Sequence, residues 1–317
     1  MTAKEKTNFP IEKRSLRKRI HIEMTQNWDL YLLILPVLAY FIIFCYYPMY
    51  GAQIAFRDYR ATRGIAGSEW VGLEHFIRFF SGAYAKRLLI NSFEISFWSL
   101  IFGFPMPIIL ALMLNEIRGR KFKKTVQFVT YAPHFLSTVV IVGILNSFLS
   151  VDSGLLNQIL RRMGSEPVNF LIDPTKFKPI YILSGVWQST GYGSIIYLAA
   201  LNGIDSMLYE AAMVDGASRW QRLLHITLPC LLPTVVIMLI LNSGSIMSVG
   251  FEKVFLMQND LNMSESDVIS TYVYRAGLIN ADFSFASAVG LFNSVISFVM
   301  VIIINFIARR VGETSLF

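Results

Sequence analysis

Long apolar runs alternate with short charged connections along the whole chain. A bilayer core of about 30 Å requires about 20 mostly apolar residues per helix. Isolated spans must satisfy their backbone groups internally, and the alternating pattern of barrel strands is absent, so each run predicts an α-helix. Six stretches meet this requirement, and they run approximately from Leu30 to Ala55, Leu88 to Leu114, Val126 to Leu149, Ile180 to Ala200, Leu223 to Val249 and Ala286 to Ala308. The predicted fold class is therefore an all-α membrane protein with six transmembrane helices.

Several of these runs contain proline, which breaks soluble helices at a cost of about 3 kcal/mol or more. In a membrane bundle, neighbouring helices can satisfy the carbonyl groups that proline frees. The prolines are Pro36, Pro48, Pro105, Pro107, Pro133 and Pro233. We therefore expect bent helices around a cavity.

Basic residues mark one side of the predicted bundle. They fill the tail 1–28, the connection 118–124, the connection between the fourth and fifth spans, and the pair Arg309 and Arg310. The last external connection, 250–282, is acidic instead. Because cytoplasmic loops carry an excess of Lys and Arg, both termini are expected in the cytoplasm. The first external connection, 57–87, departs from this rule because it is also basic, and we expect it to be a folded extracellular segment.

Composition agrees with a membrane class. The 317 residues are 54% hydrophobic and only 15% charged, a composition that is too apolar for an ordinary soluble domain. The formal net charge is +7. The basic residues lack the interleaved aromatics of a nucleic-acid surface. The two cysteines, Cys45 and Cys230, lie in or beside apolar runs and predict neither a disulfide framework nor a metal site. The first run follows a charged tail without a small-residue cleavage site, which indicates a retained span.

The segment 205–229 between the fourth and fifth spans carries the most information. Asp205 or Ser206 can cap a helix start, and Asp215-Gly216 is a turn signal that ends this helix. Ser218 can cap a second short helix from Arg219 to Leu224, which leads into Pro229 at the head of the next span. This pattern predicts a helix–turn–helix elbow at the membrane surface. The alternative is a plain connection between two spans.

The elbow resembles the EAA loop of ATP-binding cassette importer permeases. Glu210-Ala211-Ala212 is followed after three residues by Gly216, and after nine more by Ile226-x-Leu228-Pro229. In that family the loop forms a coupling helix that docks on the ATPase subunit. The resemblance implies the same role here for Glu210, Ala211, Ala212, Asp215, Gly216, Arg219, Ile226, Leu228 and Pro229. The chain contains no Gly-x4-Gly-Lys-Ser/Thr loop, so ATP hydrolysis is expected on separate subunits.

Similarity to these permeases extends over nearly the whole chain. Within the family it resembles the carbohydrate-uptake, MalF-like branch, and most closely the LplB-like group that handles oligosaccharides derived from polysaccharides. The matching stretches are 32–36, 71–76, 111–116, 131–137 and 271–275. The sequence Ala132-Pro133-His134 stands where related chains often have Leu-Pro-His, which is a minor departure.

This resemblance implies a type I importer fold in a bacterial cell membrane. It also implies a heterodimer with a second permease, two cytoplasmic ATPase subunits that bind ATP and Mg, and an extracytoplasmic solute-binding protein. No cofactor or metal is expected on this chain, and the expectation is a transport subunit and not an enzyme. The implied organisation is a cytoplasmic basic tail over 1–28, the first helix and external loop over 29–87, and a permease core over 88–310 with the coupling loop at 205–229.

Polar side chains inside the spans are candidates for the substrate path because they are costly in lipid and tend to face the bundle interior. Interhelical hydrogen bonding is the alternative, and it is favoured for Asn146 and Asn293. Aromatic residues of the fourth span can stack on sugar rings, or can be packing aromatics at the interface. His134 stands alone and is expected to be structural. The predicted path residues are Trp187, Gln188, Tyr192, Asn242, Ser245 and Ser248.

Two other classes of function compete with an ATP-driven importer. A secondary transporter would show inverted repeats or broken half-helices in both halves. A membrane enzyme would need a convergent catalytic set. Neither feature is found in the sequence.

Overall fold

The structure is a computed structural model that describes residues 26–244 and 249–311. It divides into two compact units, residues 1–53 and 54–317. The described residues are mainly helical, and a single two-stranded sheet is the only β structure among them. The all-α prediction is confirmed.

The described part of the first unit is an apolar helix. It consists of α2 (Trp28–Phe41), the π-helical turn η1 (Ile42–Tyr46), α3 (Tyr47–Met49) and the start of the 3₁₀ segment η2 (Tyr50–Phe56). The helix continues to Phe56, and the 29 residues Trp28–Phe56 are long and apolar enough to cross a membrane, because no charged residue interrupts the chain between Asp29 and Arg57. The element matches the predicted span from Leu30 to Ala55.

The second unit begins with a small folded segment at one end of its spans. Strand β1 (Arg57–Asp58) pairs antiparallel with β2 (Glu69–Trp70), so that Arg57 lies opposite Trp70. Two helices, α4 (Gly64–Gly67) and α5 (Glu74–Ser81), complete the segment, and α5 packs against the last span. The ring of Phe56 stacks on Trp70 with the centroids 5.5 Å apart. The expectation that this connection is folded agrees with the structure.

Three helices of the second unit satisfy the length and composition of a membrane span. The first joins α6 (Ala85–Gly103) to α7 (Pro105–Glu116) through Phe104. The second runs over Arg219–Ser243 and ends six residues before the predicted boundary at Val249. The third lies within α18 (Phe283–Val311). With the helix of the first unit, the described residues contain four such helices, or five if one bent pair is counted as a span.

That bent pair replaces the straight third span predicted from Val126 to Leu149. Helix α8 (Arg120–Tyr131) continues into the 3₁₀ turn η3 (Ala132–Phe135), and α9 (Thr138–Leu149) then leaves at an angle of 103°. The break has a local cause. Ser137 is extended, with ψ 155°, and its hydroxyl accepts a hydrogen bond from the Val140 amide at 3.4 Å, so it starts a new helix.

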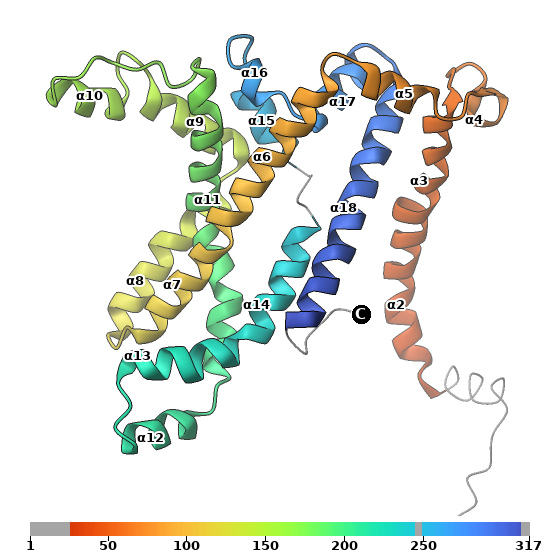
Figure 1. Ribbon diagram of the computed structural model, residues 1–317. Coiled ribbons are helices and arrows are strands. Elements are labelled where there is room, and N and C mark those ends of the chain that lie inside the picture. The colour runs from red at the N-terminus through yellow and green to blue at the C-terminus, as the bar shows by residue number, and fades with distance from the viewer. Residues whose placement is uncertain (1–25, 245–248, 312–317) are drawn as a thin grey trace, which may run out of the picture. The chain divides into compact units, whose positions relative to one another are not determined.

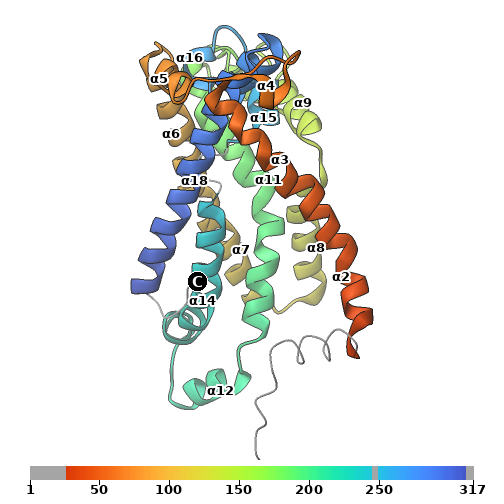
Figure 2. The same ribbon diagram turned by 90° about the vertical axis from the view of Figure 1, so that its right-hand side faces the viewer.

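Helix α11 (Pro174–Asn202) lies at the centre of the second unit (Figure 1, Figure 2). It packs against α6, α7, α8, η3, α14 and α16. It has 29 residues but does not reach the apolarity of the four span helices. A helix surrounded by other helices can carry more polar side chains than one surrounded by lipid, and this accounts for the difference.

The close packing of α11 on α8 depends on one glycine. A Cβ atom placed on Gly191 would lie 1.9 Å from the carbonyl oxygen of Thr130 and 2.3 Å from its carbonyl carbon. Only a residue without a side chain allows the two backbones to approach so closely. Gly191 is buried in the structure.

Several other short helical elements of the second unit lie at the end where β1 and β2 are found, whereas α12 (Ser206–Val214) and α13 (Arg219–Arg222) lie at the opposite end (Figure 1). Five such elements lie at the end with β1 and β2. They are α10 (Leu155–Arg162), α15 (Phe251–Met257), α16 (Met263–Ser266), α17 (Ile269–Tyr274) and the π-helical η5 (Arg275–Ile279).

Ion pairs at this end join the basic first connection to the acidic last one. Asp267, whose side chain is only 2% exposed, pairs with Arg87 at 3.5 Å and with Arg275 at 2.6 Å. Arg78 pairs with Asp282. Two of the six basic residues of 57–87, Arg78 and Arg87, are thus paired with acidic residues of 250–282.

Candidate functional site

The elbow between α11 and the next span begins with α12 (Ser206–Val214). The Asp205 carboxylate accepts a hydrogen bond from the Met207 amide at 2.9 Å and caps the helix start, as predicted. The helix ends at Val214, and Gly216 in the turn that follows has a φ of +78°. The Ala217 amide bonds the Ala212 carbonyl at 2.8 Å, and the Gly216 amide bonds the Met213 carbonyl at 3.1 Å. These two bonds form a Schellman motif, in which the left-handed position favours glycine.

The second half of the elbow is continuous with the span. Ser218 and Gln221 form a capping box, with the Ser218 amide bonded to the Gln221 side chain at 2.8 Å and the Gln221 amide bonded to the Ser218 hydroxyl at 3.3 Å. Helix α13 (Arg219–Arg222) follows, then the π-helical turn η4 (Leu223–Thr227) and α14 (Leu228–Ser243). The predicted second short helix is therefore the first turn of a single helix over Arg219–Ser243.

Helix α12 exposes apolar side chains. None of its nine residues is buried, and Val214 is 88% exposed and Met207 66% exposed. One side-chain hydrogen bond, 3.0 Å between the hydroxyls of Tyr209 and Thr227, ties it to the span. An exposed apolar projection of this kind is typical of a protein–protein contact.

The residues predicted for ATPase coupling all lie in this elbow or in the first turns above it. Glu210, Ala211 and Ala212 lie on α12, Asp215 and Gly216 form the turn, and Arg219, Ile226, Leu228 and Pro229 follow on the continuous helix. Glu210 is exposed, whereas Ile226 and Leu228 are half-buried. Their contact with an ATPase stays a prediction.

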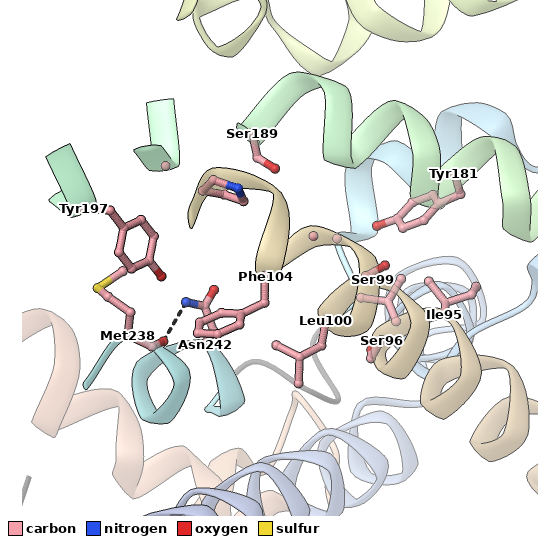
Figure 3. A pocket seen from close by; sticks show the side chains of 15 residues that line it. Ile95, Ser96, Ser99, Leu100, Phe104, Tyr181, Ser189, Tyr197, Met238 and Asn242 are labelled. Carbon is pink, nitrogen blue, oxygen red and sulfur yellow. Dashed lines mark hydrogen bonds between the residues drawn. The ribbon is translucent and has the colours of Figure 1, made fainter. Parts of the chain in front are cut away.

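A cavity of about 320 Å³ lies between α6, α7, α11 and α14 (Figure 3). Among the described residues, no charged side chain lines it. Its lining consists of Ile95, Ser96, Ser99, Leu100, Gly103, Phe104, Pro107, Tyr181, Ser189, Gly193, Tyr197, Met238, Asn242, Val249 and Gly250.

The chemistry of this cavity suits a neutral, hydroxyl-rich ligand. Serine and tyrosine hydroxyls and the Asn242 amide can donate and accept hydrogen bonds. The faces of Phe104 and Tyr197 offer apolar surfaces of the kind that complement the C–H face of a sugar ring. In Figure 3, Tyr197 and Asn242 lie at one end of the cavity and Tyr181 at the other, and the Asn242 amide donates to the Met238 carbonyl at 2.7 Å.

The structure brings one of the predicted path residues to this cavity, namely Asn242. Tyr192 instead contacts η3, and Gln188 contacts Leu136, the residue that follows η3. The Gln188 amide donates to the Leu136 carbonyl at 3.3 Å, and the Tyr192 ring stacks on His134 with the centroids 3.9 Å apart. Trp187 is half-exposed and also lies outside the lining. Ser245 and Ser248 lie outside the described residues.

Sequence reasoning missed the polar residues that share a face of α11 toward the cavity. Ser189, Gly193 and Tyr197 follow one another at intervals of four, so they share a face of the helix, and Tyr181 lines the cavity two turns earlier. This spacing was the available signal. Elsewhere in the described residues, no group of three or more His, Cys, Asp or Glu side chains is placed to hold a metal ion.

Comparison with known proteins gives a consistent result. The family model described as "Binding-protein-dependent transport system inner membrane component" matches residues 103–313. The polygalacturonan/rhamnogalacturonan transport system permease protein YteP of Bacillus subtilis (strain 168) is 44% identical over 307 residues, which cover 97% of this chain and 96% of YteP. Protein LplB of the same organism is 43% identical over 288 residues, with 91% of each chain covered.

A solved structure matches this chain over nearly its whole length. A chain of a bacterial ABC transporter involved in the import of the acidic polysaccharide alginate superposes with a TM-score of 0.85 at 42% identity. The match covers 93% of this chain and 99% of that one. The same transporter type was also solved in complex with an alginate pentasaccharide-bound periplasmic protein, and its matching chain gives a TM-score of 0.86.

Proposed function

The chain belongs to the family of binding-protein-dependent transport system inner membrane components, and from this premise we propose how it takes part in the import of oligosaccharides derived from a polysaccharide. It is a membrane transport subunit and not an enzyme. Its partners in the importer are a second permease, ATPase subunits and a binding protein. The observation that carries the proposal is the elbow, in which the exposed apolar helix α12 is joined through the turn at Gly216 to a helix over Arg219–Ser243 that reaches the cavity.

In the proposed mechanism, the ATPase subunits bind α12 and move it when they bind and hydrolyse ATP. Because α13, η4 and α14 form one helix, this movement reaches Asn242 at the cavity. ATP and Mg²⁺ are bound by the partner subunits alone. The cavity provides hydroxyl, amide and ring surfaces for a sugar as it passes between the two permeases.

This mechanism predicts uptake that depends on ATP. The complete complex in proteoliposomes, supplied with a loaded binding protein outside and ATP inside, is expected to accumulate labelled oligosaccharide and to hydrolyse ATP faster than without the binding protein. The control omits the ATPase subunits. Uptake by the two permeases alone, driven by a proton or sodium gradient, would contradict the proposal.

We also propose that the elbow and both termini lie in the cytoplasm. In Figure 1 the elbow, the turn from α7 to α8 and the last turn of α18 lie at the same end of the second unit. These segments carry Arg219, the basic residues 118–124 and the pair Arg309 and Arg310, in agreement with the excess of basic residues in cytoplasmic loops.

Cysteine labelling tests this orientation. With Cys45 and Cys230 replaced by serine, a membrane-impermeant maleimide added to intact cells is expected to label a cysteine at Asp260 and to spare one at Gly119 or Ser15. Labelling at Gly119 or Ser15 without labelling at Asp260 would reverse the orientation. Permeabilised cells provide the control, because all three positions are then accessible.

A further inference from the structure

The polar side of α10 is turned toward its own loop. Asn157 is fully buried, and its amide nitrogen donates to the carbonyls of Ser150 at 3.0 Å and Val168 at 2.9 Å, while its oxygen accepts from the Val168 amide at 2.8 Å. Arg161 donates to the carbonyls of Val151 at 2.9 Å and Asp152 at 3.1 Å. The polar residues of this helix therefore hold the loop from residue 150 to residue 168 together.

The apolar side of α10 is turned outward. Leu155, Ile159 and Met163 follow one another at intervals of four and thus share a face, and they are 51%, 44% and 75% exposed. Leu156, beside them, is 40% exposed. This arrangement is the reverse of a surface helix in water, which buries its apolar face and exposes its polar one. An apolar medium or partner is required on the outer side.

The position and charge of α10 favour lipid as that medium. It follows α9 closely in the chain and lies crosswise to the spans, at the end of the unit away from the elbow (Figure 1). Phe148, in the last turn of α9, is also exposed. The two charged residues on α10 are Arg161 and Arg162, both in its last turn. Apolar residues on one face with arginines beside them are typical of helices that lie in the headgroup region of a bilayer.

Acidic residues flank the helix but do not lie on it. Asp152 precedes α10, and Glu166 and Asp173 follow it. A protein partner on the apolar face would have to match the exposed Arg162 with its own acidic group. Phospholipid phosphates provide that group wherever the helix lies at the surface of the membrane.

We propose that α10 is an interfacial anchor that lies in the outer leaflet of the membrane, with Leu155, Ile159 and Met163 among the acyl chains and Arg162 at the level of the phosphates. The anchor holds the outer end of α9, and through it the bent pair α8 and α9, at a fixed depth. The choice of the outer leaflet rests on the orientation proposed above. The proposed contact with lipid is independent of that orientation.

Spin labels on the two faces of α10 test this proposal. The assembled transporter with Cys45→Ser and Cys230→Ser is reconstituted into bilayers of phosphatidylethanolamine and phosphatidylglycerol, and a nitroxide is attached at Ile159→Cys or, as the matched control on the polar side, at Gln158→Cys. Power saturation then measures collision with oxygen, which concentrates in lipid, and with a water-soluble nickel chelate. We expect the label at position 159 to collide several-fold more with oxygen than with the chelate, and the label at position 158 to show the opposite ratio.

Three results would overturn the proposal. Greater access to the chelate than to oxygen at position 159 would place the face in water. Low access to both would indicate that the second permease covers it. Loss of access only after the binding protein is added would identify that protein as the occupant. Oligosaccharide uptake by the same labelled complexes reports on the proposed transport function separately, so the two proposals can fail independently.

Discussion

At the scale of single residues, Gly216 is the position in the predicted coupling elbow where the backbone conformation most favours glycine. Its φ of +78° lies in the left-handed region, where a Cβ atom costs of order 1 kcal/mol. A Cβ there would meet no neighbouring atom. The cost of a side chain at this position therefore comes from the backbone and not from crowding.

Replacing Gly216 with Val is expected to misdirect α12 and to uncouple ATP hydrolysis from uptake, or to release the ATPase subunits, while the protein still inserts in the membrane. Gly216→Asn is the matched control, because asparagine tolerates the left-handed region, and it should retain most of the uptake. Co-purification of the ATPase and uptake assays on both variants measure the effect. Wild-type behaviour of Gly216→Val would show that the turn geometry is not needed for coupling.

At the scale of helices, α11 sets the geometry of the core. Its glycine at position 191 allows the backbone of α8 to approach, while its residues Tyr181, Ser189 and Tyr197 line the cavity. The same helix thus fixes the bent pair on one side and the candidate ligand surface on another.

Gly191→Ala is expected to force α11 and α8 apart, because the added methyl group would lie 1.9 Å from a carbonyl oxygen that belongs to the backbone and cannot rotate away. Overpacking of this kind costs about 1–3 kcal/mol or more. We expect a clear fall in the unfolding temperature of the purified protein in detergent. Gly143→Ala in α9 is the control, since a Cβ there meets no atom within 4 Å. Equal unfolding temperatures for the two variants would contradict the packing argument.

The sequence predicted the existence and type of these helices well, because apolar runs in lipid have few alternatives to a helix. It placed the start of α11 at Ile180, whereas Asp173 caps the helix and Pro174 is its first residue. That signal was present in the sequence and was hidden by the polar residues between Pro174 and Ile180. The break at Ser137 was also missed, because a hydrophobic run does not show a change of direction.

The candidate site was harder to predict than the fold. The elbow is local, so its caps at Asp205 and Ser218 could be identified from sequence alone. The cavity is formed by side chains from helices that are distant in sequence, and aromatic and polar residues occur on more than one face of α11. Tyr192 and Tyr181 are similar in the sequence, and only the packing of η3 against one face distinguishes them.

At the scale of the whole second unit, buried charge joins segments that are far apart in the chain. Asp267 accepts hydrogen bonds from Arg275 at 2.6 Å and from the Thr271 hydroxyl at 3.1 Å, and it also pairs with Arg87 of α6. Asn91 of α6 donates to the Asp267 carbonyl at 3.1 Å. The end of α6 is therefore held against the segment that contains α17.

Asp267→Asn is expected to destabilise the protein by about 3 kcal/mol, because it leaves two partly buried arginines without their carboxylate. Asp58→Asn is the control. It removes an ion pair with Arg60 in which both side chains are about half exposed, and such pairs contribute about 1 kcal/mol or less. Thermal unfolding in detergent compares the two. Similar losses would indicate that the buried network contributes no more than a surface pair.

The unbroken helix from Arg219 to Ser243 has a mechanical consequence. It has 25 residues and is thus about 37 Å long at 1.5 Å per residue, with the capping box of Ser218 at one end and Asn242 at the other. If the elbow moves as proposed, a helix without a break can carry its displacement to the cavity. Its most compliant point is the stretch around Pro229 and Pro233, where two backbone donors are missing. In the proposed mechanism, the movement of the elbow and the change at the cavity are therefore one motion of this helix.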